Sequence, residues 1–138
     1  MALTSLQNVK SRYRLTGIAL RVLLTSMFWL SGLSKLLSFH DAIEEMQHFG
    51  LSPAAPIAAL VIGVSLVGSL LVIGGRYVSL GALMLAVFTM STIPVAHDFW
   101  NMTGLNAVME KYAVWEHLTV IGAFLLVALH SIREIKKS

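Results

Sequence analysis

Two short polar clusters mark the places where this apolar chain could do chemistry. The first directly follows an apolar segment and consists of His97, Asp98, Phe99, Trp100 and Asn101. The second, Glu116-His117, opens another apolar segment. Histidine changes its charge near neutral pH and can transfer protons, and an aromatic neighbour can stack on a flat ring. If both segments cross a membrane, we expect the two clusters to meet at one membrane face.

Both clusters also fit a purely structural interpretation. Trp100 would belong to the aromatic belt at a membrane–water interface, and His97 would end a helix. Glu116 would stabilise the N-terminus of its helix through the helix dipole. Histidines and carboxylates on one face could also hold a metal ion. No pair has a recognised zinc spacing and no haem-attachment motif is present, so we predict no metal site.

Two basic residues, Arg21 and Lys35, lie inside the first apolar segment, on nearly the same face of a helix. Ionisable side chains inside a membrane are costly and usually face the interior of a bundle. Arg21 is close to one end, where its long side chain could simply reach the interface. Lys35 points back into the membrane, so we expect a carboxylate partner for it, with Asp98 and Glu116 at a suitable depth. A purely structural ion pair is the alternative to a chemical role.

Four apolar segments are long enough to carry these residues across a bilayer. A helix that crosses the hydrocarbon core needs about 20 mainly apolar residues. The stretches 15–37, 54–74, 78–97 and 113–132 meet that length. Spanning segments must satisfy their own backbone hydrogen bonds, so we predict helices. The expected fold class is all-α, an integral membrane four-helix bundle formed by a single domain over 1–138, with an uncleaved first helix.

Two further patterns concern packing. Small residues let membrane helices approach closely, and the second segment carries a set of them. Ala55, Ala59 and Gly63 recur every four residues and are followed by Ser65, Gly68 and Ser69, and the third segment has Gly81, Ala82 and Ala86. Between the first and second segments, the stretch 38–53 predicts a short amphipathic helix along the interface. Its apolar face would consist of Ala42, Ile43, Met46 and Phe49.

The basic residues predict the orientation. With four spans, both termini and the middle loop share one side, and that side carries Lys10, Arg12, Arg14, Arg76, Arg133, Lys136 and Lys137. The opposite loops carry only Lys111. Because cytoplasmic loops are enriched in Lys and Arg, we expect both termini in the cytoplasm and the two polar clusters at the outer face.

The composition excludes several classes of protein. Of the 138 residues, 57% are hydrophobic and 12% are charged, about half the charged share of a typical soluble domain. The net charge of +3 comes from residues at segment ends and not from a basic patch, so we expect no nucleic-acid partner. The chain has no cysteine, which excludes disulfides, thiol redox chemistry and cysteine-ligated iron–sulfur clusters.

With these residues in view, the chain resembles the short four-helix type of the DoxX family of small bacterial inner-membrane proteins. The resemblance rests on the stretches 28–36 (FWLSGLSKL), 46–50 (MQHFG), 97–102 (HDFWNM) and 121–126 (IGAFLL), and it extends over nearly the whole chain. One position departs from the family pattern. Family members often carry a glutamate in the second helix, where this chain has Ser65.

The resemblance implies a small quinone-linked redox subunit, or a membrane partner of a soluble or membrane oxidoreductase. A quinone would then enter from the lipid, where a histidine would bond one carbonyl and a lysine would hold negative charge on the ring. We predict catalytic roles for His97, His117, Lys35, Glu116 and Asp98, and ligand contacts from Trp100, Asn101 and Arg21.

Two alternatives remain open at this point. The bundle could be a non-catalytic scaffold that recruits a partner protein, in which case the lysine and the acids only fix helix packing. A small transporter is less compatible with the pattern, since four helices without an inverted repeat leave little room for alternating access. Either form allows a homo-oligomer within the lipid bilayer.

Overall fold

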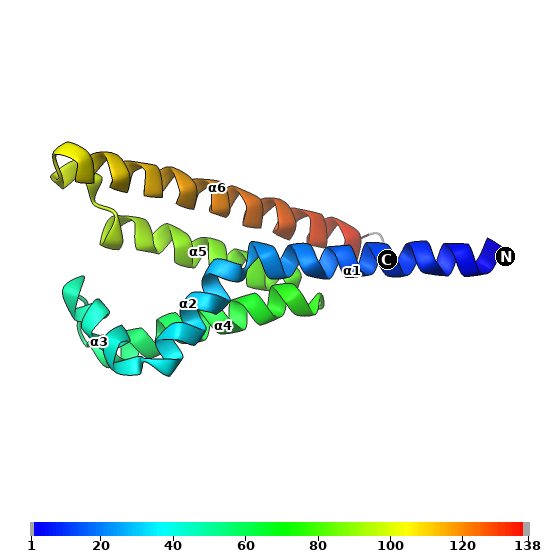
Figure 1. The fold of residues 1–138 in the computed structure, drawn as a ribbon, viewed down its shortest axis with the longest axis horizontal. Helices are drawn as coiled ribbons and strands as arrows, with labels where there is room; N and C mark the ends of the chain where they lie inside the picture. Colours follow the sequence, from blue (N-terminus) through cyan, green and yellow to red (C-terminus); the bar gives the residue numbers. More distant parts are fainter. Residues whose placement is uncertain (1, 137–138) are drawn as a thin grey trace.

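The computed structural model describes residues 2–136, with side chains from residue 11 onward, and that part of the chain is helical throughout without a strand (Figure 1). The elements in chain order are α1 (Ala2–Leu24), α2 (Ser26–Leu37), α3 (Phe39–His48), α4 (Ala54–Gly74), α5 (Val78–Ala96), the short 3-10 helix η1 (Phe99–Asn101) and α6 (Gly104–Ile135). Three of the helices are long and apolar enough to cross a membrane, and a bent pair, α1 with α2, makes up to four. The predicted all-helical architecture is confirmed.

The first segment is not the single helix predicted over 15–37. It bends by 56° between Ser11–Leu24 and Ser26–Leu37. At the bend, the hydroxyl of Thr25 donates a hydrogen bond to the carbonyl of Arg21 at 2.8 Å, and Trp29 Nε1 donates to the carbonyl of Val22 at 3.2 Å. These side-chain donors satisfy carbonyls at the break, which is the condition for a break inside a membrane.

The predicted amphipathic helix between the first two spans is confirmed as α3. Its buried residues, Ala42 and Met46, pack with Ala58 of α4 in a small apolar cluster. The apolar face therefore packs against protein, although the pattern alone suggested that it would lie on the membrane interface.

Helices α4 and α5 approach each other closely at Gly68 and Gly81, two of the predicted small residues. A Cβ atom on Gly81 would lie 2.7 Å from the carbonyl oxygen of Gly68, and one on Gly68 would lie 2.7 Å from the side chain of Leu85. The first part of the predicted set faces elsewhere: Ala55 and Ala59 are exposed, and nothing lies within 4 Å of a Cβ added to Gly63. The second part, Ser65, Gly68 and Ser69, is buried together with Val72.

The last helix is much longer than the predicted span 113–132. Helix α6 has 32 residues and is about 48 Å long, which exceeds the ~30 Å hydrocarbon core. Most of the expected loop 97–112 is thus helix. Glu116 lies inside α6 and not in its first turn, so its predicted role as an N-terminal stabiliser is wrong.

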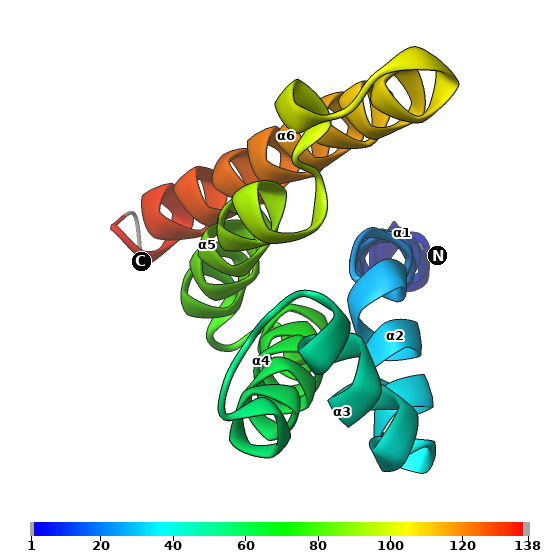
Figure 2. The ribbon, with the colours of Figure 1, turned by 90° about the vertical axis from the view of Figure 1, so that its left-hand side faces the viewer.

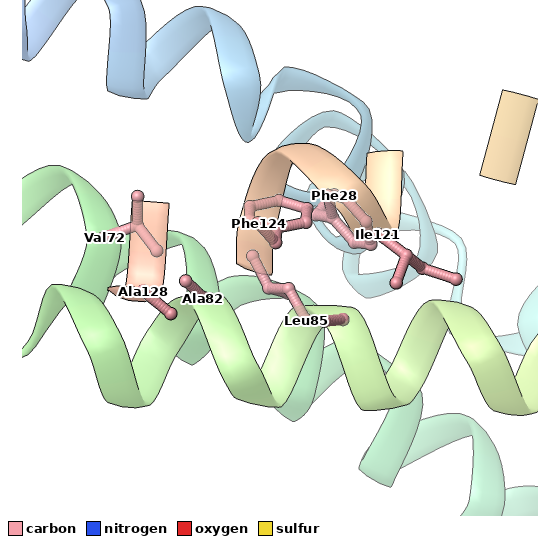
Figure 3. Close-up of a cluster of buried hydrophobic side chains, with 8 residues drawn as sticks. Phe28, Val72, Ala82, Leu85, Ile121, Phe124 and Ala128 are labelled. Carbon is pink, nitrogen blue, oxygen red and sulfur yellow. The ribbon is translucent and has the colours of Figure 1, made fainter. Parts of the chain in front are cut away.

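A cluster of buried side chains joins the bent first span to α5 and α6 (Figure 3). Phe28 of α2 contacts Phe124 of α6 edge to face, with ring centroids 5.4 Å apart, and it contacts Phe88 of α5 at 6.3 Å. The rest of the cluster is Val72, Ala82, Leu85, Ala86, Ile121 and Ala128. Helix α5 packs along α6, whereas α2 packs on α4, and no Cα atoms of α2 and α5 come within 8 Å of each other in this part of the chain (Figure 2).

The start of α1, the end of α6 and the turn between α4 and α5 lie at one end of the bundle, and α3 and η1 lie at the other (Figure 1). This arrangement is the one expected for an even number of spans. We call the end that holds α3 and η1 the α3 end.

Candidate functional site

A cavity of about 620 Å³ occupies the α3 end of the bundle, where α2 and α5 diverge. Its walls come from most of α2, the end of α3 and the loop after it, the first half of α4, most of α5, and one residue of α6, His117. Most of the lining is apolar. Its volume lies within the usual range of small-molecule sites.

Several apolar side chains line the cavity and are still exposed on the surface of the helices. They are Met27 of α2, Leu60 of α4, and Val87 and Val95 of α5. All four belong to helices that are candidate spans or part of the bent pair. The mouth of the cavity would therefore open sideways into hydrocarbon, and a ligand could enter from the lipid.

One wall of the cavity carries an ion pair between Lys35 of α2 and Glu45 of α3. The expectation that Lys35 has a carboxylate partner is confirmed, but the expected partners, Asp98 and Glu116, are wrong. The pair is partly shielded, with 19% of the Lys35 side chain and 41% of the Glu45 side chain exposed. The α3 helix supplies the partner because it folds back beside α2. The positions of the apolar segments in the sequence do not predict this fold-back.

Sequence reasoning overlooked Glu45, although a signal was present. Glu45 follows Ala42 by three residues and precedes Phe49 by four, so it lies on the apolar face of the amphipathic helix. A carboxylate on such a face has to meet a cation or a polar group.

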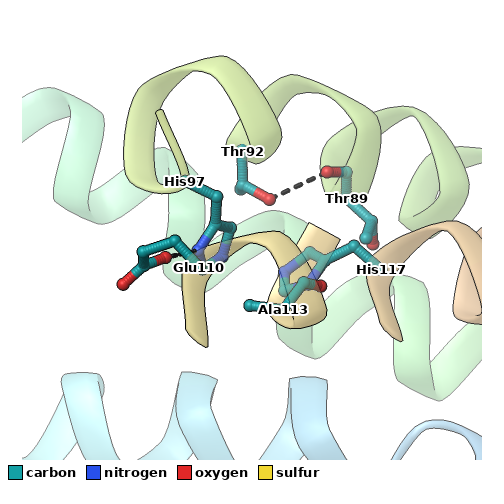
Figure 4. A network of polar contacts seen from close by, with 6 residues as sticks. All are labelled: Thr89, Thr92, His97, Glu110, Ala113 and His117. Carbon is teal, nitrogen blue, oxygen red and sulfur yellow. Dashed lines mark hydrogen bonds and ion pairs between the residues drawn. The ribbon is translucent and has the colours of Figure 1, made fainter. Parts of the chain in front are cut away.

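The opposite wall carries two histidines that meet as predicted (Figure 4). The rings of His97 and His117 pack edge to face, with centroids 4.6 Å apart and an interplanar angle of 62°. His97 Nδ1 lies 2.6 Å from a carboxylate oxygen of Glu110, and His117 Nδ1 lies 2.8 Å from the carbonyl oxygen of Ala113. Glu110 was also overlooked; it precedes His117 by seven residues, two turns along one face of α6.

The end of α5 holds His97 in place. The backbone N–H of His97 donates to the carbonyl of Ile93 at 3.0 Å, so His97 is the last residue tied to that helix. This position agrees with the predicted helix-ending role, and the ring contact adds a second role at the cavity wall. Thr89 and Thr92 line the same wall, and Thr92 donates its hydroxyl hydrogen to the carbonyl of Thr89 (Figure 4).

Five of the predicted site residues do not line the cavity: Asp98, Trp100, Asn101, Glu116 and Arg21. Asp98 accepts a hydrogen bond from the Asn101 side chain at 3.3 Å, and Trp100 is exposed and packs on Phe99. Glu116 is exposed on α6.

Arg21 lies toward the other end of the bundle. Its guanidinium nitrogen is 2.7 Å from the place where a Cβ on Gly75 would be, against the turn after α4. Arg21 therefore lies beside the turn between α4 and α5, outside the cavity lining.

Ser65 lies at the cavity wall, buried in α4. Its position matters because the family resemblance places a glutamate there. The cavity has a neutral hydroxyl at this point, and its charged groups come from α2 and α3 instead. Within residues 2–136, no three His, Asp or Glu side chains converge closely enough to hold a metal ion.

Comparison with known proteins gives two matches. The family model described as DoxX matches residues 17–98. The chain is also similar to the inner membrane protein YphA of Escherichia coli strain K12, with 26% identity over 110 residues that cover 79% of this chain and 78% of that protein. No solved structure matches the chain.

Proposed function

This chain belongs to the DoxX family, and from that premise we propose that it is an inner-membrane protein that binds a quinone and serves as a small subunit or membrane partner of an oxidoreductase. The localisation follows the relative named as an inner membrane protein. It also agrees with helices long and apolar enough to span a bilayer.

The observation that carries the proposal is the cavity with an apolar mouth and two polar walls. The mouth, at Met27, Leu60 and Val87, favours a ligand that partitions into lipid. The polar walls, at Lys35 and at the histidine pair, favour a ligand with separate polar atoms. A molecule with both properties is amphipathic and flat enough to pass between helices.

The residues present fit a quinone head group. A benzoquinone or naphthoquinone ring has oxygen atoms on opposite sides and an apolar ring and tail between and beyond them. Lys35 Nζ on one wall and the imidazole nitrogens of His97 and His117 on the other are polar groups of the required kind. Phe28 and Phe88 supply apolar and aromatic surface between these walls.

A bound quinone would supply two-electron redox chemistry. The chain itself would bind the head group, exclude water with its apolar lining and hold protons at the imidazole nitrogens. The positive charge of Lys35 would favour electron density on a nearby oxygen. Because the chain has no cysteine to ligate an iron–sulfur cluster, we infer that a partner protein handles the electrons.

The orientation is part of this proposal. The basic residues near the chain ends and at Arg76 favour the cytoplasm for the end of the bundle that holds the termini. The α3 end, with the cavity, would then lie toward the outer face of the membrane.

The test is quinone binding by the purified protein in lipid nanodiscs. We expect saturable binding of a short-tail ubiquinone or a short-tail menaquinone, in the oxidised or the reduced form. His97→Ala should weaken binding of the reduced form about tenfold or more, since that change removes a polar partner of the ligand hydroxyl at the cavity wall. His130→Ala is the matched control, because His130 is exposed in the last turns of α6 and does not line the cavity. Folded wild-type protein that binds neither quinone in either form would refute the proposal.

A further inference from the structure

We propose that this cavity prefers the reduced, hydroxyl-bearing form of its ligand, a quinol, over the quinone, and that Glu110 is the positioning residue that sets this preference through His97. The inference rests on the proposed function and names the form of the ligand that the site is built to hold. It follows from which polar hydrogen atoms on the cavity wall already take part in hydrogen bonds within the protein.

The backbone decides the tautomer of His117. Its Nδ1 lies 2.8 Å from the carbonyl oxygen of Ala113. A carbonyl oxygen can only accept, so Nδ1 carries the hydrogen and donates it. In the neutral imidazole the other nitrogen, Nε2, is then a hydrogen-bond acceptor.

Glu110 has the same effect on His97. Its carboxylate oxygen lies 2.6 Å from His97 Nδ1, and an ionised carboxylate only accepts hydrogen bonds. Nδ1 of His97 therefore donates to Glu110, and the neutral ring presents Nε2 as an acceptor. Glu110 itself is not part of the cavity lining, so it acts on a ligand only through His97.

The three hydroxyl groups that α5 contributes to the lining also donate their hydrogen atoms within the helix. Thr89 donates to the carbonyl of Leu85 at 2.8 Å, Thr92 donates to the carbonyl of Thr89 at 2.8 Å, and Ser91 donates to the carbonyl of Phe88 at 2.7 Å. All three side chains line the cavity and retain only oxygen lone pairs toward it. Along this wall, from α5 to α6, the polar groups accept hydrogen bonds.

The rest of the lining adds Lys35, Glu45 and the hydroxyls of Ser31 and Ser65, which can donate or accept. Lys35 Nζ is a donor, but one of its hydrogens is directed to Glu45. Glu45 is an acceptor-only carboxylate that lines the cavity as well. A quinol brings two hydroxyl donors to these acceptors, whereas a quinone brings two more acceptors and leaves the histidine nitrogens without a partner. Both rings are partly buried, and a bound ligand would shield them further from water. A polar group that is left unmatched there is costly, so we expect the quinol to bind about tenfold more tightly than the quinone.

The experiment compares three ligands with the same ring and tail in nanodiscs, under anaerobic and mildly alkaline conditions. They are a short-tail ubiquinol, the corresponding quinone, and the di-O-methyl ether of the quinol, which keeps the reduced ring but has no hydroxyl hydrogen. We expect the quinol to bind most tightly and the ether to lose that advantage. Nitrogen NMR of histidine-labelled protein, assigned with His97→Ala and His117→Ala, should show both neutral rings with the hydrogen on Nδ1.

The role of Glu110 is tested by the ratio of quinol to quinone affinity, which a loss of folding alone would not change. Glu110→Leu should bring the ratio of quinol to quinone affinity close to one. In the NMR spectrum, the neutral ring of His97 should then no longer be held with its hydrogen on Nδ1. Glu110→Gln can still accept through its amide oxygen and should restore part of the ratio. Glu116→Gln, an exposed position on the same helix, is the control and should leave the ratio unchanged.

Three outcomes are distinguishable. Binding of neither form would refute the proposed function itself. Equal affinities, or a tighter quinone, would overturn the inference while leaving quinone binding intact. A quinol preference that is unchanged in Glu110→Leu would show that Glu110 does not set this preference.

Discussion

Lys35, in the last turn of α2, forms an ion pair with Glu45 of α3, ten residues further along the chain. The pair joins the bent first span to the helix that folds back beside it, and it does so at the wall of the cavity. One interaction therefore serves both the packing of α3 and the polarity of the site.

We predict a measurable coupling between these two residues. Lys35→Met and Glu45→Gln should each lower the free energy of unfolding, and the double variant should cost less than the sum of the two. The coupling should be about 1 kcal/mol or less, because Glu45 is partly exposed and solvent weakens such pairs. Unfolding by sodium dodecyl sulfate in mixed micelles, followed by circular dichroism, measures each free energy. Strictly additive losses would show that the pair contributes nothing to packing.

Gly81 should be the least replaceable glycine of the packed helices α4 and α5. A Cβ there would meet the backbone oxygen of Gly68 at 2.7 Å, and a backbone atom cannot move aside as a flexible side chain can. We expect Gly81→Ala to lower the free energy of unfolding by about 1–3 kcal/mol, the usual cost of overpacking. The same micelle unfolding experiment measures it.

Gly63→Ala is the matched control for that change. Gly63 lies in the neighbouring helix α4 with nothing within 4 Å of an added Cβ, so its replacement should be neutral or slightly stabilising. If the two substitutions cost the same, the close approach of α4 and α5 would not be the reason for glycine at position 81.

Trp29 should stabilise the bend of the first span through its ring nitrogen. It donates to the carbonyl of Val22 at 3.2 Å, seven residues earlier. Trp29→Phe keeps most of the apolar ring but leaves this carbonyl without its side-chain donor, which should cost about 1 kcal/mol. Trp115→Phe, at an exposed tryptophan of α6, should cost less. Equal losses of stability would mean that the hydrogen bond across the bend has no net effect.

The orientation of the bundle can be tested with single cysteines, because the natural chain has none. Asn101→Cys lies at the α3 end and Tyr77→Cys lies in the turn after α4, and both positions are exposed. We expect a membrane-impermeant maleimide to label Asn101→Cys in intact bacterial cells and Tyr77→Cys only after the inner membrane is permeabilised. The reverse pattern would place both chain ends outside the cytoplasm.

The sequence by itself determined the class of the fold and the pairing of the two histidines. Long uncharged runs leave helices as the only structure that satisfies the backbone in lipid, so the apolar segments fixed α4 and α5 to within a residue. The apolar runs 78–97 and 113–132 are joined at one face, so His97 and His117 lie at the same depth, and their rings pack together although α6 itself begins earlier, at Gly104.

Only the tertiary structure decided which carboxylates pair with Lys35 and His97. Residue types show that Lys35 needs a carboxylate, but the choice of Glu45 over Asp98 and Glu116 depends on the 56° bend and on α3 folding back. Likewise, Glu110 reaches His97 because α6 already begins at Gly104. The helix places Glu110 two turns before His117. Hydropathy cannot reveal these contacts, since it measures transfer into lipid, whereas bends, helix rotation and partner choice come from packing between helices.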